Sequence, residues 1–258
     1  MNPPNNKAVA QTAVAEAAVA VVICAAGSSA RMGGIKKEYC PLPGSPGGQS
    51  VLGAAVSAFV SAGGIPVIVI AVPADPAAGE NAARAALPPQ LLAGSNVPAI
   101  HFVPGGKTRR ASVFNALSLL NTLNPAPDFV LIHDGARPWV SPSLIRRVIA
   151  AVKKHQAVIP LVPMTETPKE TDAPLEGAGD GIFIKQHLRR SFVGAAQTPQ
   201  AFAFGEIFAA HKKAARETSA GFEYTDDAEI WASFCGPVAA VPGEPENRKI
   251  TFSQDMVC

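Results

Sequence analysis

The chain has 258 residues, of which 48% are hydrophobic, so it can bury a full core as one α/β domain. Charged residues make up 16% and the formal net charge is only +2, which excludes a basic surface of the size that nucleic acid binding requires. The cysteines and histidines are scattered, without Cys-x-x-Cys or His-x-x-x-His pairs, which excludes a zinc enzyme and a disulfide framework and favours the cytoplasm.

The Ala-rich N-terminal stretch runs into the apolar segment Val19 to Ile23, which could mimic a signal peptide. Glu16 interrupts the apolar run, and cleavage after this segment would detach a strand from the glycine loop that follows it. No uninterrupted apolar segment approaches the ~20 residues that a membrane-spanning helix requires. We therefore expect residues 1 to 17 to be a disordered extension and residues 18 to 258 to form a single domain.

Short β-branched runs alternate with Ala- and Leu-rich segments, a pattern typical of a Rossmann-like α/β fold, with a mostly parallel sheet and helices on both faces. The expected strands are Val19 to Ala26, Pro66 to Val72, Ala99 to Val103, Phe129 to His133, Ala157 to Val162 and Val238 to Val241. The expected helices are Ser50 to Ala62, Glu80 to Ala86, Thr108 to Leu120, Pro142 to His155, Phe204 to Glu217 and Asp226 to Phe234.

Two segments do not follow this alternation. Pro41 to Gly48 is rich in proline and glycine and is interpreted as a surface loop. Met164 to about Arg190 mixes charge, proline and glycine, with few apolar residues before Ile182-Phe183-Ile184, and is interpreted as an excursion from the sheet.

Sheets of this type bind ligands beyond the carboxyl ends of their strands. Three of the expected strands lead into polar, glycine-rich loops: Gly27-Ser28-Ser29-Ala30-Arg31-Met32-Gly33-Gly34, Pro104-Gly105-Gly106 and Asp134-Gly135-Ala136-Arg137-Pro138. We expect these loops to converge on one crevice.

The first of these loops is short of side chains between Gly27 and Ala30, so its backbone N–H groups can surround phosphate oxygens. Arg31, Lys36 and Lys37 add positive charge nearby. The loop has neither the Walker pattern nor Gly-x-Gly-x-x-Gly, and a glycine turn after a strand can be purely structural. The adjacent cations favour an anion site.

The first motif reads Ala25-Ala26-Gly27-Ser28-Ser29-Ala30-Arg31-Met32, followed by Lys37-Glu38-Tyr39. It resembles the corresponding motif of nucleotidyltransferases, a group that includes molybdenum-cofactor guanylyltransferases and sugar-phosphate nucleotidyltransferases. Five later segments distinguish among these families: Gly105-Gly106-Lys107-Thr108-Arg109-Arg110-Ala111-Ser112, His133-Asp134-Gly135-Ala136-Arg137-Pro138, Thr198-Pro199-Gln200, Thr225-Asp226-Asp227-Ala228 and Asn247-Arg248-Lys249-Ile250-Thr251. In this order they resemble the 2-C-methyl-D-erythritol 4-phosphate cytidylyltransferase family, over about Val19 to Asp255.

The resemblance implies a cytidylyltransferase that joins CTP and 2-C-methyl-D-erythritol 4-phosphate into 4-CDP-2-C-methyl-D-erythritol and releases pyrophosphate, on the non-mevalonate route to isoprenoids. It implies Mg²⁺ as cofactor, held by Asp134, and a homodimer formed through a projecting β-arm, approximately residues 164 to 190, with no nucleic acid or membrane partner. The implied catalytic residues are Arg31, Lys37, Arg190 and Lys249. The implied CTP contacts are Ala25, Ala26, Gly27, Ser28, Ser29, Gly106, Lys107, Arg109, Ser112, Asp134 and Gly135, and those of the acceptor are Arg137, Thr167, Arg190, Thr198, Thr225 and Lys249.

Alternatives remain open for the residues and for the function. Lys37 could be a solvated loop lysine, Arg109 a helix N-terminal residue that faces water, and Asp134 a structural partner of Arg137. Ser29 replaces a glycine of the family motif, and the spacing from Arg31 to Lys37 is one residue shorter than in the family. A CDP-ribitol pyrophosphorylase would share the fold, CTP and most motifs, whereas a non-catalytic CTP-binding regulator would bind without turnover.

Overall fold

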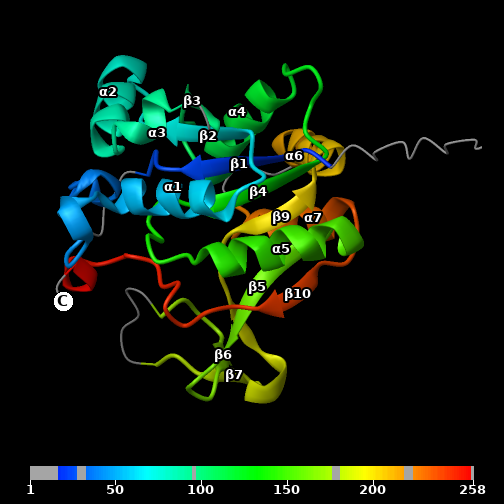
Figure 1. The fold of residues 1–258 in the computed structure, drawn as a ribbon. Helices are drawn as coiled ribbons and strands as arrows, with labels where there is room; N and C mark the ends of the chain where they lie inside the picture. The colour runs from blue at the N-terminus through cyan, green and yellow to red at the C-terminus, as the bar shows by residue number, and fades with distance from the viewer. Residues whose placement is uncertain (1–16, 28–32, 95–96, 176–180, 218–222, 257–258) are drawn as a thin grey trace, which may run out of the picture.

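The computed structural model describes residues 17–27, 33–94, 97–175, 181–217 and 223–256 (Figure 1). Except for Ala17, the N-terminal extension expected from the sequence lies outside these residues. The described residues form a mixed, mostly parallel sheet covered by helices on both faces, which confirms the α/β class.

The main sheet contains the strands β1 (Val19–Cys24), β2 (Val67–Val72), β3 (Ala99–Pro104), β4 (Phe129–Asp134), β5 (Ala157–Pro163), β8 (Gly194–Ala196), β9 (Gln200–Ala203) and β10 (Ala239–Pro242). Their order is β10-β5-β9-β4-β1-β2-β3, with β8 paired to β5. The six expected strands are present, with ends that differ by at most two residues. The sequence does not predict β8 and β9, which run antiparallel to their neighbours and are too short to show a clear alternation.

The helices are α1 (Val51–Ala62), α2 (Pro76–Ala86), α3 (Gln90–Ala93), α4 (Arg109–Leu120), α5 (Pro142–His155), α6 (Phe204–Glu217) and α7 (Asp227–Phe234). The side chains of Ser50, Thr108, Ser141 and Asp226 each accept a backbone N–H in the first turn of a helix, which explains where α1, α4, α5 and α7 begin. The expected start of α2 at Glu80 is wrong by four residues, because the helix begins at Pro76, a residue type favoured in the first turn. In the part of the chain that the structure describes, no helix has the length and apolar character needed to cross a membrane.

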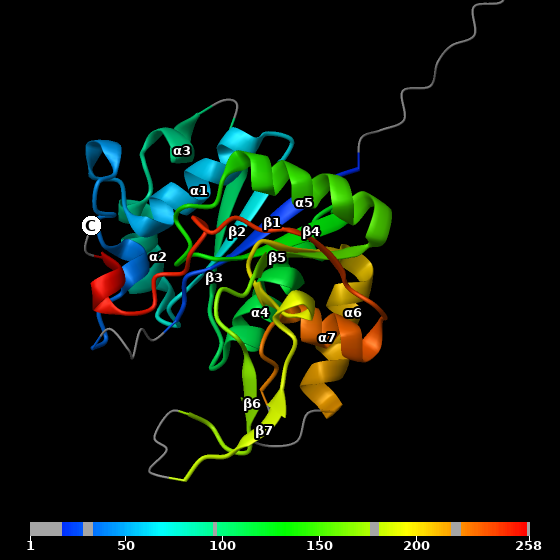
Figure 2. The ribbon, with the colours of Figure 1, turned by 90° about the horizontal axis from the view of Figure 1, so that it is seen from below.

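The core lies in two layers, one on each face of the sheet. Strand β1 alternates between them, since Val21 and Ile23 belong to one apolar cluster and Ala20 and Val22 to the other. Helices α1 and α5 cover the first face, and α4, α6 and α7 cover the second (Figure 2). The sheet is therefore buried on both sides, and its polar residues are concentrated at the strand ends.

The excursion expected over residues 164 to 190 is an arm that projects from the sheet (Figure 1). Its strands β6 (Lys169–Thr171) and β7 (Ile184–His187) pair antiparallel in a separate two-stranded sheet. The apolar side chains of Leu175, Phe183 and Ile184 are exposed on this arm, and that of Phe192 at its base is 83% exposed. The predicted projecting β-arm is confirmed.

The proline- and glycine-rich segment that follows the first loop is compact. Lys37–Tyr39 and Pro46–Gly48 form 3-10 helices, and a bridge between Pro41 and Ser50 closes the expected surface loop. The turn that carries Lys37 packs against α1.

Candidate functional site

A cavity of about 670 Å³ lies at the carboxyl ends of β1, β3 and β4. All three expected loops contribute to it, so their predicted convergence is confirmed for the described residues. The lining residues are Cys24, Ala26, Gly27, Lys36, Lys37, Glu38, Pro73, Ala74, Gly105, Gly106, Lys107, Thr108, Arg109, Ser112, Asp134, Ala136, Glu223 and Lys249. The cavity therefore combines a small-residue wall with several cations.

The small-residue wall depends on two glycines. A Cβ atom on Gly105 would lie 2.3 Å from the Cβ of Ala26, and one on Gly106 would lie 2.3 Å from the Cβ of Ala111, so neither position accommodates a side chain. The Gly106 N–H donates to the Ser112 Oγ at 3.0 Å, and this hydroxyl donates to the Thr108 carbonyl oxygen at 2.9 Å. The wall is thus a fixed backbone surface that a flat ring can approach closely.

The positive charge near the first loop comes from two adjacent lysines. Lys36 Nζ donates to the Gly27 carbonyl oxygen at 2.5 Å, which ties the following turn to the end of the loop. Lys37 is only 9% exposed and lies in the cavity wall. Its interpretation as a solvated loop lysine is therefore wrong. Ser28, Ser29 and Arg31 lie outside the described residues.

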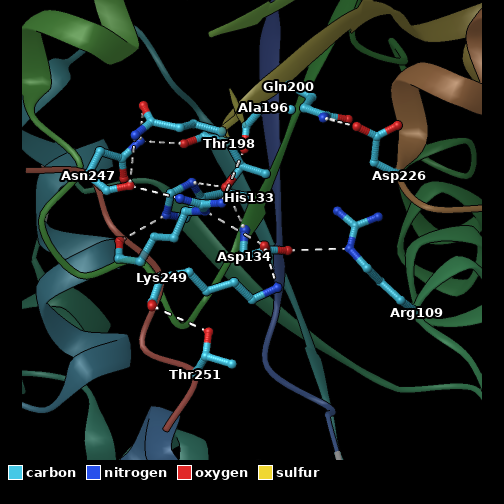
Figure 3. A network of polar contacts seen from close by, with 12 residues as sticks. Arg109, His133, Asp134, Ala196, Thr198, Gln200, Asp226, Asn247, Lys249 and Thr251 are labelled. Carbon is cyan, nitrogen blue, oxygen red and sulfur yellow. Dashed lines mark hydrogen bonds and ion pairs between the residues drawn. The ribbon is translucent and has the colours of Figure 1, made fainter. Parts of the chain in front are cut away.

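Asp134, the last residue of β4, is the acidic centre of the cavity (Figure 3). Its carboxylate lies 2.9 Å from Lys249 Nζ, 3.3 Å from Arg109 Nε and 3.8 Å from Arg137 Nε. Burial favours the neutral acid, but Arg109 and Lys249 outweigh burial and hold the pKa of Asp134 well below its usual range. Asp134 is therefore ionised at neutral pH. It pairs with Arg109 and Lys249 as well as with Arg137, so it is not only a structural partner of Arg137.

Arg109 is the first residue of α4, and its side chain is 28% exposed. Besides Asp134, it contacts Asp227, with Nη1 2.8 Å from the Asp227 Oδ2. A side chain that bonds two carboxylates does not simply face water, so that alternative is wrong.

A buried hydrogen-bond chain fixes Asp134 from behind. The Asp134 N–H donates to the Thr198 Oγ1 at 3.1 Å, and this hydroxyl lies 3.0 Å from His133 Nδ1 (Figure 3). His133 Nε2 lies 3.1 Å from the Arg137 carbonyl oxygen. Because a carbonyl can only accept, Nε2 carries the proton and Nδ1 accepts from Thr198. Burial lowers the pKa of His133 to about 4, so the ring is neutral.

The C-terminal segment that carries Lys249 is attached to the sheet by polar contacts. Arg137 Nη1 donates to the Asn247 carbonyl oxygen at 2.8 Å, and Asn247 Nδ2 donates to the Thr198 carbonyl oxygen at 2.8 Å. Gln197 Nε2 donates to the Glu244 carbonyl oxygen at 2.7 Å. These contacts position Lys249 from a segment distant in sequence.

The structure brings only part of the expected acceptor set together. Arg137 and Thr198 lie beside Asp134, whereas Arg190 donates to the Thr165 carbonyl oxygen at 2.7 Å, at the base of the arm. Thr167 is exposed on the arm. Thr225 donates its N–H and hydroxyl to the Glu229 carboxylate, at 2.7 and 2.8 Å, as part of the N-terminal cap of α7.

Sequence reasoning assigned no role to His133, Gln197, His211, Asp227 or Asn247. His133 and Asp227 each lie next to an acidic residue in a motif quoted above, and this position is the sequence signal that could have identified them as site residues. For Gln197 and His211 the sequence offers no signal, because their contacts join segments that are distant in the chain.

The neutral state of His133 predicts a pH dependence of stability. The pKa is about 4 in the folded chain and 6.5 ordinarily, so the unfolded chain binds more protons between these values, and stability falls as pH falls from about 6.5 to 4. The loss approaches about 3 kcal/mol, and His133→Gln removes this contribution because glutamine does not titrate. Urea unfolding of the unchanged chain and of His133→Gln at several pH values measures this loss. If the free energy of unfolding had the same slope against pH in both proteins, the prediction would be contradicted.

Comparison with known proteins agrees with this geometry. The family model described as IspD, 2-C-methyl-D-erythritol 4-phosphate cytidylyltransferase, matches residues 19–258. The bifunctional enzyme IspD/IspF of Mesorhizobium japonicum is 37% identical over 95% of this chain and 55% of its own length, so the chain spans about half of that relative. The 2-C-methyl-D-erythritol 4-phosphate cytidylyltransferase of Saccharopolyspora erythraea is 34% identical over 92% of this chain and 96% of its own length.

Solved structures show the same similarity. The crystal structure of 4-diphosphocytidyl-2C-methyl-D-erythritol synthase from Anaerococcus prevotii has a TM-score of 0.71 and 28% identity, with 93% of each chain covered. That of 2-C-methyl-D-erythritol 4-phosphate cytidylyltransferase from Thermus thermophilus has a TM-score of 0.64 and 31% identity, with 93% of this chain and 96% of the other covered. This chain therefore belongs to the 2-C-methyl-D-erythritol 4-phosphate cytidylyltransferase family.

Proposed function

We propose that the chain transfers CMP from CTP to 2-C-methyl-D-erythritol 4-phosphate, forming 4-CDP-2-C-methyl-D-erythritol and pyrophosphate. The observation that carries this proposal is the cavity that Lys37, Lys107, Arg109 and Lys249 line together with the ionised Asp134, which pairs with Arg109 and Lys249. Such a concentration of cations fits a polyanionic nucleotide, and the glycine wall beside Ser112 fits a flat base. Membership of the family supports both assignments.

The reaction needs positioning and charge neutralisation more than covalent help from the protein. A phosphate oxygen of the acceptor attacks the α-phosphorus of CTP, and the bond to pyrophosphate breaks. Lys37 from the cavity wall neutralises the charge that gathers on the α-phosphate, while Gly106 and Ser112 hold the cytosine. Lys249, which lies at the Oδ2 of Asp134 while Arg109 lies at the Oδ1, receives the acceptor phosphate.

We propose Mg²⁺ as the cofactor, and the residues present fit it. No cluster of three or more His, Cys, Asp or Glu side chains that could hold a metal occurs among the described residues. Mg²⁺ that arrives with a triphosphate takes most of its ligands from phosphates and water, so one carboxylate is sufficient. Asp134 on the cavity wall supplies it. The bound ion would neutralise phosphate charge.

The proposed reaction is tested by offering the purified protein each nucleoside triphosphate with methylerythritol phosphate or ribitol 5-phosphate. We expect mass spectrometry to detect one nucleotide product, the CDP-methylerythritol, together with pyrophosphate. This product should no longer form when EDTA removes Mg²⁺. Faster turnover of ribitol 5-phosphate than of methylerythritol phosphate would overturn the proposed acceptor, and turnover in the presence of EDTA would overturn the proposed Mg²⁺ requirement. Binding of CTP without any product would indicate a regulator.

The two lysines are expected to differ in their kinetic effects. Lys37→Ala removes a cation that acts on the transition state and should lower kcat by about 100-fold or more. Lys249→Ala removes a cation for the bound acceptor and should mainly raise its KM. Steady-state kinetics with both substrates separate these outcomes, and Lys154→Ala, an exposed lysine at the end of α5, is the matched control. Near-normal kcat in Lys37→Ala would remove its catalytic role.

We also propose a homodimer formed through the arm. Exposed aromatic side chains of Phe183 and Phe192 support it, because single domains rarely leave such surface in water. Arg190 and Thr167 lie on or beside the arm, away from the lining of their own cavity, and a partner chain would bring them to the acceptor.

The dimer is tested by sedimentation of Phe183→Ser. We expect a dimer for the unchanged chain and monomers with a raised acceptor KM for the variant, because the substitution removes apolar surface from the interface. Leu92→Ser, at a partly exposed leucine of α3, is the control and should remain dimeric. A dimer that survives Phe183→Ser with unchanged kinetics would contradict the proposed interface.

We place this activity in the cytoplasm, without nucleic acid or membrane partners. Cys24, Cys40 and Cys235 are free thiols in the described part of the chain, as a reducing compartment allows. Burial raises the pKa of Cys24 to about 12, so this thiol stays protonated in the cavity wall. The net charge of +2 fits small anionic substrates that need only local cations.

A further inference from the structure

Arg109 lies between two carboxylates that have different surroundings. Its Nε is 3.3 Å from Asp134, which lines the cavity and also contacts Lys249 and Arg137. Its Nη1 is 2.8 Å from Asp227, whose side chain is fully buried behind the cavity. One contact is therefore open to a ligand, and the other is closed to it.

The closed contact is built from two further helices. Asp227 is the first residue of α7, where unpaired N–H groups stabilise a negative charge. Its other oxygen, Oδ1, lies 3.2 Å from the Nε2 of His211, a fully buried residue of α6. Burial alone would favour the neutral acid, but Arg109 and His211 outweigh it and lower the pKa of Asp227. Asp227 is thus an ionised anchor for Arg109 in the protein interior.

The two contacts differ in what happens when a triphosphate enters. A polyanion in the cavity competes with Asp134 for Arg109, because Asp134 and Arg109 both line the cavity that the polyanion enters. It cannot compete with Asp227, which solvent and ligands do not reach. Asp227 therefore keeps the guanidinium at one place in the free and the occupied cavity, and its orientation need not be fixed during binding.

We propose that Asp227, supported by His211, is a positioning residue that holds Arg109 at the cavity and thereby sets the affinity for the nucleoside triphosphate. The proposal rests on the proposed function, which supplies the nucleotide. It assigns Asp227 no contact with the substrate, so its effect passes through Arg109 alone. A purely structural role would change the stability of α7 and leave nucleotide affinity unchanged.

The test is a double-mutant cycle on CTP binding, measured by calorimetry with Mg²⁺. Asp227→Asn keeps the shape and removes the charge, and we expect its Kd for CTP to rise about 10-fold, the usual worth of a charge-assisted bond. In an Arg109→Ala background the same change should add nothing, because Arg109 carries the effect. The KM for CTP should rise in parallel, while the KM for the acceptor and kcat stay within about 3-fold.

Controls separate this result from a folding defect. Glu80→Gln removes a carboxylate that pairs with Arg84 on the exposed surface of α2 and should leave the Kd unchanged. If Asp227→Asn does not fold, two variants of His211 test the proposal instead. His211→Gln keeps a polar group beside the Asp227 Oδ1, where the His211 Nε2 lies 3.2 Å away, whereas His211→Leu removes it, and only the second should weaken CTP binding.

The outcomes are distinguishable from failure of the proposed function. No CTP binding by the unchanged chain would overturn the proposed function. Tight CTP binding by that chain with an equal Kd for Asp227→Asn, or for the two His211 variants, would overturn the positioning role alone. An effect of Asp227→Asn that persists in Arg109→Ala would also overturn it.

Discussion

The ionised carboxylate of Asp134 is the group on which the arrangement of the cavity depends. Arg109, Arg137 and Lys249 come from three distant parts of the chain and lie within 4 Å of it. Like charges this close repel strongly where water is scarce, so the carboxylate is what allows them to gather before any substrate is present. The cavity is thus prepared for a polyanion without an anion bound.

The topology explains how these groups reach one point. Strands β1 and β4 are parallel neighbours, so their carboxyl ends and the loops that follow lie at the same edge. Strand β9 runs antiparallel to β4, with Ile132 opposite Gln200, so β9 begins where β4 ends. This places Thr198 beside His133 and Asp134, and Asn247 then attaches the C-terminal segment to the same place. The antiparallel strand β9 and the residues just before it therefore supply the support behind the carboxylate.

The sequence predicted the parts of the molecule that follow local periodicity. The strands β1 to β5 and β10 and most of the helices could be predicted because β-branched and Ala- and Leu-rich runs are local signals, whereas the arm was recognised by its charge, proline and glycine, which break that pattern, and by the family resemblance. Strand β9 could not, because four buried residues between Pro199 and α6 show no distinct period. Asp134 and Lys249 were assigned from a resemblance, whereas the contacts of Asp227 with His211 and of Gln197 with Glu244 join distant segments and follow only from the fold.

Arg109 and Lys249, which share Asp134, differ in how firmly they are held, and this difference suits the two substrates of the proposed reaction. Arg109 is 28% exposed and has a second, buried carboxylate, so its position is fixed before ligand binding. Lys249 is 42% exposed, and its flexible stem reaches Asp134 from a segment held by Asn247. A rigid guanidinium favours a ligand with a defined geometry, such as a triphosphate fixed by its base, at little entropic cost. In the proposed reaction, the flexible stem of Lys249 would let its ammonium follow the acceptor phosphate toward the reacting phosphorus, while Arg109 would hold the donor at a fixed place beside the same carboxylate.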